Sequence, residues 1–376
     1  MSKTEAQVLE AIDRIAQQVI APAAVEVDRQ GQFPRAAIDA LGKEGLLGLT
    51  VDPAFGGLGH GPRVAALVVE RIARECGSTA MVVCMHYAAT AVLEKHAPDR
   101  IRRDVAAGRH LSTLAFSEAG SRSMFWAPVS TAQKTAEGFR LNARKSWATS
   151  ARNATSFVWS SRPVAAEGAS TIWLVMRDSA GLRTGGSFDG LGLRGNDSLP
   201  VTAEDLLVAE SNRLGEDGKG LDVMLGVVLP VFNLLSAATS VGLMEASAAR
   251  TAAHASAARF EHTGTTLAEL PTIRAYVARM RIATDMARCL LLDSAAAIEG
   301  GREDTMLRVL ECKAAAGEAA LSVTDTAMRV CGGAAFRKEV GVERAFRDAR
   351  AASVMGPTTD ALYDFIGKAI TGLPVF

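Results

Sequence analysis

The stretch LRVLECKAAAGEAALSVTDTAMRVC, residues 307–331, decides how the last third of the chain folds. Its small and apolar residues recur at alternating steps of three and four: Leu307, Leu310, Ala314, Gly317, Leu321, Thr324, Met328 and Cys331. This spacing places them on one face of an α-helix, which must be buried against other helices. Long helices of this kind form bundles that often dimerise or tetramerise through the remaining apolar face. We therefore predict a helical bundle and a homodimer or homotetramer.

Upstream of this helix the hydrophobic pattern changes twice. From residue 4 to about 110 apolar residues follow a helical period, as at Val8 and Ile12. From 112 to 212 they alternate with polar residues in short runs, as at Phe139 and Leu141, which is typical of antiparallel strands. The pattern predicts an α+β protein, mostly α. Its expected parts are an N-terminal helical domain (1–111), a middle antiparallel β domain (112–212) and a C-terminal four-helix bundle (213–376).

Composition excludes several classes of function. The 376 residues include 41 basic and 41 acidic side chains, so charge gives no reason to expect nucleic acid as a partner. No apolar run is expected to reach the roughly 20 residues that span a bilayer, and the polar N-terminus lacks the apolar core of a signal peptide. The five cysteines show no C-x-x-C spacing. We expect a cytoplasmic protein without a metal site or membrane insertion.

Short motifs follow one another in a consistent order along nearly the whole chain. They are Phe55-Gly56-Gly57-Leu58-Gly59, Phe116-Ser117-Glu118-Ala119-Gly120, Lys145-Ser146-Trp147-Ala148-Thr149, Cys331-Gly332-Gly333 and Arg347-Asp348-Ala349-Arg350. Their shared order and spacing resemble the acyl-CoA dehydrogenase family. This resemblance implies the three-domain fold, a non-covalent FAD between the β domain and the bundle, and an acyl thioester as substrate. It also implies an electron-transfer flavoprotein as a possible partner.

The resemblance also implies which residues contact FAD. Trp147 would pack against the isoalloxazine ring, and the hydroxyl of Thr149 would hydrogen-bond near its N5 atom. The positions implied for the cofactor are Phe116, Ser117, Ser123, Trp147, Thr149, Arg259, Arg329, Gly332, Gly333, Thr358 and Asp360. Gly332 and Gly333 match backbone positions that approach the FAD of a neighbouring subunit. Arg329 stands where the family carries Gln, and Arg259 is displaced by one residue from the family's Arg.

The substrate side departs from the family pattern. In the family's C-terminal signature, RDA(K/R) is followed by E-G-T, whose Glu commonly removes the α-proton; here Gly356 takes its place and has no side chain to accept a proton. The alternative base position falls on Phe232, and Asn233 follows it where the family usually has Arg. Arg122 replaces a glycine and adds a cation. We assign Arg122, Asn233 and Gly356 to the substrate site.

The base and the reaction remain open from the sequence. His86 is a candidate substitute base, although a structural hydrogen bond is the more ordinary role for a histidine within a helix. Three functions are compatible with these residues. They are dehydrogenation of an acyl thioester with an atypical or absent base, a different flavin reaction such as elimination or oxygenation, and a base-lacking subunit of a mixed oligomer. The oxygenating relatives usually carry a histidine in the C-terminal region, and none follows His262 here.

Overall fold

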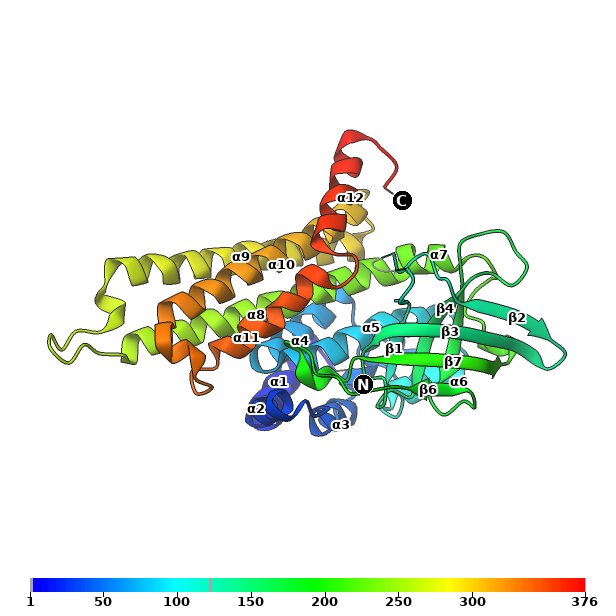
Figure 1. The fold of residues 1–376 in the computed structure, drawn as a ribbon, viewed down its shortest axis with the longest axis horizontal. Coiled ribbons are helices and arrows are strands. Elements are labelled where there is room, and N and C mark those ends of the chain that lie inside the picture. Colours follow the sequence, from blue (N-terminus) through cyan, green and yellow to red (C-terminus); the bar gives the residue numbers. More distant parts are fainter. Residues whose placement is uncertain (1–2, 122–123, 376) are drawn as a thin grey trace.

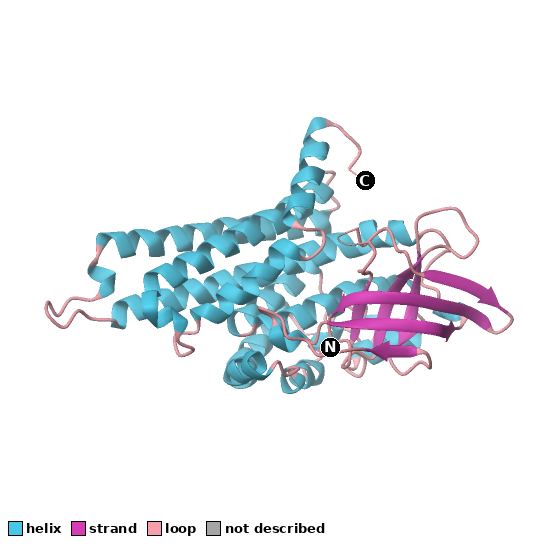
Figure 2. Ribbon diagram, in the orientation of Figure 1, coloured by secondary structure: helices cyan, strands magenta, loops and turns pink. Residues whose placement is uncertain are grey.

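The computed structural model describes residues 3–121 and 124–375 and consists of two helical parts and a β domain (Figures 1 and 2). The β domain lies at one end of the molecule, and the long C-terminal helices extend away from it (Figure 1). Helices precede and follow the strands in the chain, and the fold class expected from the sequence is confirmed. The last helix before the strands ends at Ala106, and the first helix after them begins at Gly220.

The central helix of the N-terminal domain is α5. It packs against α4, α8 and strand β1, and it is buried almost throughout its length. A helix that is apolar on all sides is suited to such a position. The helices of this domain are α1 (Glu5–Ile15), α2 (Ala21–Gln30), α3 (Arg35–Lys43), α4 (Pro62–Glu75), α5 (Gly77–His96) and α6 (Asp99–Ala106).

The β domain contains two sheets around a core of its own. One sheet has the order β1-β4-β5, from β1 (Ser112–Ala115), β4 (Ser156–Ser161) and β5 (Thr171–Met176). The other has the order β2-β3-β7-β6, from β2 (Thr131–Thr135), β3 (Gly138–Ala148), β7 (Leu199–Val208) and β6 (Leu182–Thr184). Pairing is antiparallel except between β1 and β4, which are parallel. Side-chain alternation is the same in both kinds of strand, so the sequence pattern does not distinguish them.

The C-terminal bundle is built around α8, which packs most extensively on α10 and α4. Its helices are α7 (Gly220–Val223), α8 (Leu229–Ala257), α9 (Pro271–Gly300), α10 (Thr305–Cys331), α11 (Val342–Val354) and α12 (Thr359–Thr371). Helices α8 and α10 run in the same direction, and α9 returns between them in the chain (Figure 1). Of the predicted stripe on α10, Leu310, Ala314, Gly317, Thr324 and Cys331 are buried, whereas Leu307, Leu321 and Met328 are half-buried.

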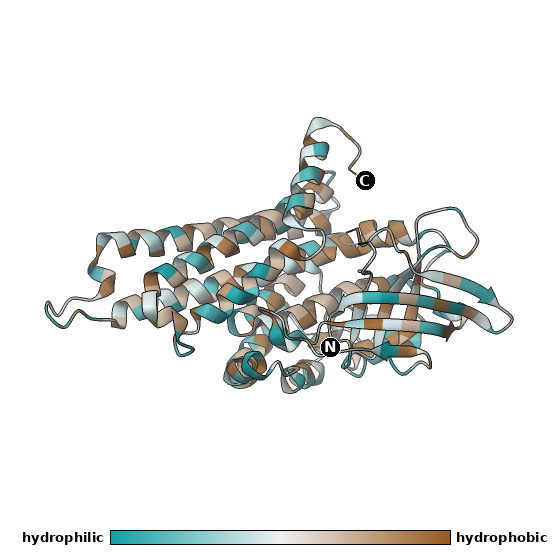
Figure 3. Ribbon diagram, viewed as in Figure 1, coloured by the Kyte–Doolittle hydropathy of each residue, from teal (hydrophilic) through white to brown (hydrophobic). Residues whose placement is uncertain are grey.

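One expectation about apolar runs is wrong. Among the described residues, Gly220–Ala257 forms one continuous helical segment that is long and apolar enough to cross a membrane by length and composition. Most of its apolar stretch is buried in this structure, because α8 lies between α4, α5, α9 and α10. Its composition is therefore explained by a central place in the core. Hydrophilic residues are instead found along outer helices such as α9 and α11 (Figure 3).

Candidate active site

A buried ion pair joins the two chain segments that carry the predicted flavin contacts. Lys145, on β3, places its Nζ 2.5 Å from Oε1 of Glu118, which follows β1. The two side chains are 0% and 1% exposed. Lys145 also donates to the carbonyl oxygen of Ser160, and the Ser146 N–H donates to the Ser117 carbonyl at 2.9 Å. These contacts hold Phe116 and Ser117 beside the segment that leads to Trp147 and Thr149.

The same pair sets the local electrostatics. Glu118 accepts hydrogen bonds from the N–H groups of Val129 and Ser130 and from the Ser130 hydroxyl. Burial works against the ionised Glu118, but the Lys145 charge and these donors lower its pKa overall. Burial lowers the pKa of Lys145 to about 8, although Glu118 opposes the shift. The pair is therefore a structural connection between the two segments.

Just beyond Lys145, β3 bends and presents Trp147 to solvent. Trp147 has φ +58, and the pairing of β3 with β7 is irregular between Lys145 and Ala148. Trp147 is 68% exposed, and its ring meets that of Phe188 in an edge-to-face arrangement with 6.4 Å between ring centroids. Two residues on, Thr149 is buried and its Oγ1 lies 3.3 Å from Oγ of Ser198. An exposed aromatic face beside a hydroxyl group fits a planar heterocycle such as isoalloxazine.

Thr358 and Asp360 lie at the start of α12. The Thr358 hydroxyl caps the helix by accepting the Ala361 N–H at 3.4 Å, and Asp360 is exposed in the first turn. A helix N-terminus favours anionic groups through its free N–H groups and its dipole. Thr358 therefore stands where a pyrophosphate can be bound.

The remaining predicted FAD residues lie elsewhere in the chain. Arg259 is in the loop between α8 and α9, at the end of the bundle far from the β domain, and donates to the Gly264 carbonyl (Figure 1). Arg329 is exposed, and its guanidinium carbon lies 5.8 Å from the Tyr276 ring centroid. Gly332 has φ +55 and ψ −136, a conformation suited to glycine. A single chain does not bring these residues to Trp147.

The surface at the two glycines is open. A Cβ atom added at Gly332 or Gly333 would meet no atom within 4 Å. A ligand or a second subunit can therefore approach this backbone closely. The prediction that these residues serve a neighbouring subunit's FAD is compatible with their position, and it stays a prediction.

The turn that carries Gly356 lies over a buried lysine. Lys313, on α10, is 1% exposed, and its Nζ donates to the carbonyl oxygens of Ala352 at 3.1 Å, Met355 at 3.1 Å and Pro357 at 2.6 Å. Burial lowers the pKa of Lys313 to about 7. In the described part of the chain no carboxylate forms an ion pair with it. Lys313 was not among the residues predicted from the sequence, and the signal that could have identified it is a charged residue within the apolar face of residues 307–331.

Two residues of α8 stand at the other substrate-side positions. Phe232 is 8% exposed and has no proton-accepting group. Asn233 is fully buried, and neither its Oδ1 nor its Nδ2 has a hydrogen-bond partner among the described residues. Native proteins leave few buried polar atoms unpaired, so Asn233 requires an explanation.

His86 has a structural position. Its Nδ1 accepts the Ser112 N–H at 3.1 Å, which requires the proton on Nε2, and Nε2 donates to the Leu47 carbonyl at 2.9 Å. Burial lowers its pKa to about 4, although these two hydrogen bonds oppose the shift. The ring thus connects α5 to β1 and to the turn at Leu46–Gly48. Neither nitrogen is free to take a proton from a substrate.

Arg122 and Ser123 lie outside the described residues. The segment that follows them crosses to the C-terminal bundle through aromatic contacts. Phe125 is 5.1 Å from Trp126, and Trp126 is 5.7 Å from Phe365 of α12, measured between ring centroids. These rings pack the β domain against α12 beside the predicted ligand site.

The RDA motif has a structural role that the sequence did not reveal. Arg347 forms an ion pair with Asp28 at 2.6 Å and joins α11 to α2. Asp348 accepts the Leu193 N–H at 2.6 Å, and burial raises its pKa to about 6. The motif thereby connects the bundle to the N-terminal domain and to the loop before β7.

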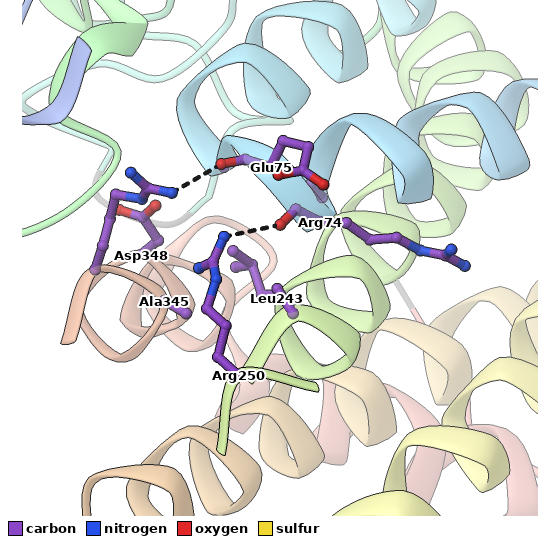
Figure 4. Close-up of a pocket in the computed structure, with 10 residues that line it drawn as sticks. Arg74, Glu75, Leu243, Arg250, Ala345 and Asp348 are labelled. Atoms are coloured by element: carbon purple, nitrogen blue, oxygen red, sulfur yellow. Dashed lines mark hydrogen bonds between the residues drawn. The ribbon is translucent and has the colours of Figure 1, made fainter. Parts of the chain in front are cut away.

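Two pockets near this motif are distinct from the predicted flavin residues. In the smaller one, Arg250 donates to the Arg74 carbonyl at the end of α4, and Arg344 donates to that of Glu75 (Figure 4). This smaller pocket has no space for a ligand, and its arginines cap the C-terminal end of α4 through these carbonyl oxygens. A cavity of about 790 Å³ shares Arg250 and Arg344 and opens between α2 and residues 338–347.

Fold and site together define a three-domain protein of the flavoenzyme type. Comparison with known families assigns residues 2–107, 113–206 and 218–371 to the acyl-CoA dehydrogenase N-terminal, middle and C-terminal domains, respectively. The chain therefore belongs to the acyl-CoA dehydrogenase family, whose members are FAD oxidoreductases.

Named relatives agree with this assignment. The chain is 28% identical over 353 residues to the bovine (Bos taurus) mitochondrial short-chain specific acyl-CoA dehydrogenase, covering 92% of this chain and 84% of the relative. It is 29% identical over 363 residues to the probable acyl-CoA dehydrogenase YngJ of Bacillus subtilis, covering 93% of each. The butyryl-CoA dehydrogenase structure from Megasphaera elsdenii superposes with a TM-score of 0.92 at 21% identity over 99% of both chains. The structure of PigA with FAD and proline superposes with a TM-score of 0.90 at 20% identity, over 99% of this chain and 98% of PigA.

Proposed function

We propose that this chain uses FAD to oxidise an acyl thioester at adjacent carbons, without a side-chain base at position 356. The observation that carries the proposal is the contrast between the two sides of the site. Trp147, Thr149 and Thr358 offer an exposed ring, a hydroxyl group and a helix N-terminus that suit a flavin nucleotide, whereas Gly356, where the resemblance implies the base, has no side chain and lies in a turn on Lys313.

FAD, when bound, supplies the hydride acceptor of this reaction. The chain's residues bind and orient: Trp147 forms a wall of the ring site, and Lys313 holds the turn by three carbonyl oxygens. His86 has both ring nitrogens in hydrogen bonds, and Lys313 donates to three backbone carbonyl oxygens, so neither offers a free lone pair in this arrangement. In the proposed reaction the α-proton is transferred to water. Loss of a positioned base lowers proton transfer by about 10²–10⁴-fold.

Anaerobic titration of the FAD-loaded protein with acyl thioesters tests the proposal. The expected result is slow bleaching of the flavin band by one chain-length class of acyl-CoA. The panel should include acyl-carrier-protein thioesters, because AnaB, a prolyl acyl carrier protein oxidase, has the same fold with a TM-score of 0.89. Reoxidation by an electron-transfer flavoprotein then tests the proposed acceptor.

The Gly356→Glu variant is the paired experiment. We expect bleaching to accelerate by about 10²-fold or more, because the variant restores a positioned carboxylate. Absence of bleaching in both proteins, with oxygen uptake by the reduced flavin, would favour a different flavin reaction. A yellow protein that stays inert until a base-containing homologue is added would instead identify a subunit of a mixed oligomer.

A further inference from the structure

Asn233 is a buried amide whose two polar atoms both lack a partner in the described structure. It lies near the start of α8, a helix that otherwise buries apolar and small residues. Some other polar residues of this helix, such as Ser240 and Ser247, donate their hydroxyl to the carbonyl four residues earlier. An amide has no comparable bond within its own helix here. No described residue supplies this partner, and a group of a bound molecule can supply it.

The geometry of the two helices places Asn233 of α8 at the same height along the bundle as Lys313 of α10. The Cys331 thiol of α10 contacts the Thr251 hydroxyl of α8, and the two helices run in the same direction (Figure 1). Asn233 lies eighteen residues before Thr251, and Lys313 lies eighteen residues before Cys331. Because about 3.6 residues make one turn, eighteen residues are five full turns and return to the same face. Asn233 thus faces α10 close to the turn that carries Gly356.

The chemistry of the two side chains selects the missing partner. The amide offers both a donor and an acceptor, and a hydroxyl group complements both. A carboxylate has no donor for Oδ1, and all three Lys313 donors are already used by carbonyl oxygens. An ammonium group has no acceptor for Nδ2 and would be repelled by Lys313. An unsubstituted alkyl chain would leave both amide atoms unpaired.

We propose that Asn233 is a specificity-determining residue that hydrogen-bonds a hydroxyl group on the acyl chain of the substrate. This inference rests on the proposed function, because it assumes that an acyl thioester binds beside Gly356. The resemblance places a paired Arg and Glu at positions 233 and 356. Their joint replacement by a neutral amide and a glycine removes both charges and leaves the amide's hydrogen-bonding capacity for a polar substituent.

Anaerobic binding of butyryl-CoA is compared with that of 2-, 3- and 4-hydroxybutyryl-CoA, followed by the change in the FAD absorption band. We expect one hydroxylated ligand to bind about tenfold more tightly than butyryl-CoA, the range expected from one hydrogen bond. In Asn233→Leu, whose side chain is of similar size, the affinities for the hydroxylated ligand and for butyryl-CoA should differ by no more than about twofold. Ser240→Ala is the matched control and should keep the wild-type ratio.

FAD content and thermal unfolding show whether each variant is folded, and Asn233→Ser is a second, smaller replacement if Asn233→Leu is not. Equal binding of all four thioesters to the wild-type protein would overturn the role of Asn233 and leave the proposed function intact. The role of Asn233 would also be overturned if a folded Asn233 variant kept the wild-type ratio of affinities for the hydroxylated thioester and butyryl-CoA. A flavin band that responds to no thioester would overturn the inference together with the proposed function.

Discussion

Removing the cation of the buried Lys145–Glu118 pair should destabilise the β domain strongly. In Lys145→Met the side chain keeps its approximate length but leaves the Glu118 carboxylate buried without its counter-ion. Because the two side chains are 0% and 1% exposed, solvent cannot compensate the charge. Breaking a buried pair by removing one partner typically costs about 3–5 kcal/mol. That is a large part of the about 5–15 kcal/mol that stabilises most proteins.

The assay is urea unfolding followed by tryptophan fluorescence, together with FAD content after gel filtration. FAD content should fall as well, because the pair holds Ser117 beside the segment that leads to Trp147. Lys219→Met is the matched control. Its ion pair with Asp222 is exposed and 4.0 Å long, so its loss should change stability by less than about 1 kcal/mol.

The double variant Lys145→Met/Glu118→Gln separates charge from packing. Gln at position 118 still accepts from the Val129 and Ser130 N–H groups but carries no charge. We expect it to recover at least about 2 kcal/mol of the loss, within the range of coupling between contacting residues. A loss below about 1 kcal/mol in Lys145→Met, or no recovery in the double variant, would show that the buried charge does not control the stability of the β domain.

Three further predictions concern buried titratable groups. His86→Gln should change the rate of flavin bleaching by less than about threefold, whereas a catalytic base would lose about 10²-fold or more, as measured by stopped-flow absorbance. His86 and His110 have pKa values lowered to about 4, chiefly by burial, so the stability they confer above pH 6.5 should be lost as the pH falls through 4. Melting temperatures at pH 7.5 and 4.5 measure this, and His110→Gln should flatten the dependence. The pKa of Asp348 is raised to about 6, so its favourable contribution is complete below pH 3.8 and lost as the pH rises through 6. Asp348→Asn, which can still accept the Leu193 N–H, should therefore gain more stability at pH 8 than at pH 4; an equal gain at both would contradict this.

The periodicity of apolar residues predicted the order of helices and strands. It worked because each zone has its own period, of 3.6 in the helices and two in the strands. It did not give the direction of the β1–β4 pair, because alternation is identical in parallel and antiparallel strands. It also missed the apolar length of Gly220–Ala257, whose burial depends on helices from both ends of the chain.

The candidate site was predicted only in part. The motifs located Trp147 and Thr149, but the ion pair that positions them joins residues 27 apart in sequence. His86 was a candidate base from the sequence, and only its two backbone partners, at Leu47 and Ser112, assign it a structural role. Lys313 was missed because a lysine in an apolar stripe has no local partner that would mark it.

The sequence by itself determined the family, the three-domain order and the absence of a carboxylate at position 356, because motifs and residue types are local properties of the chain. The tertiary structure decided what surrounds that position. It placed the Lys313 ammonium beneath the turn, left the Asn233 amide without a partner among the described residues and engaged both nitrogens of His86. These are contacts between distant segments, and their energies depend on burial and on the partners available, which exist only once the chain has folded.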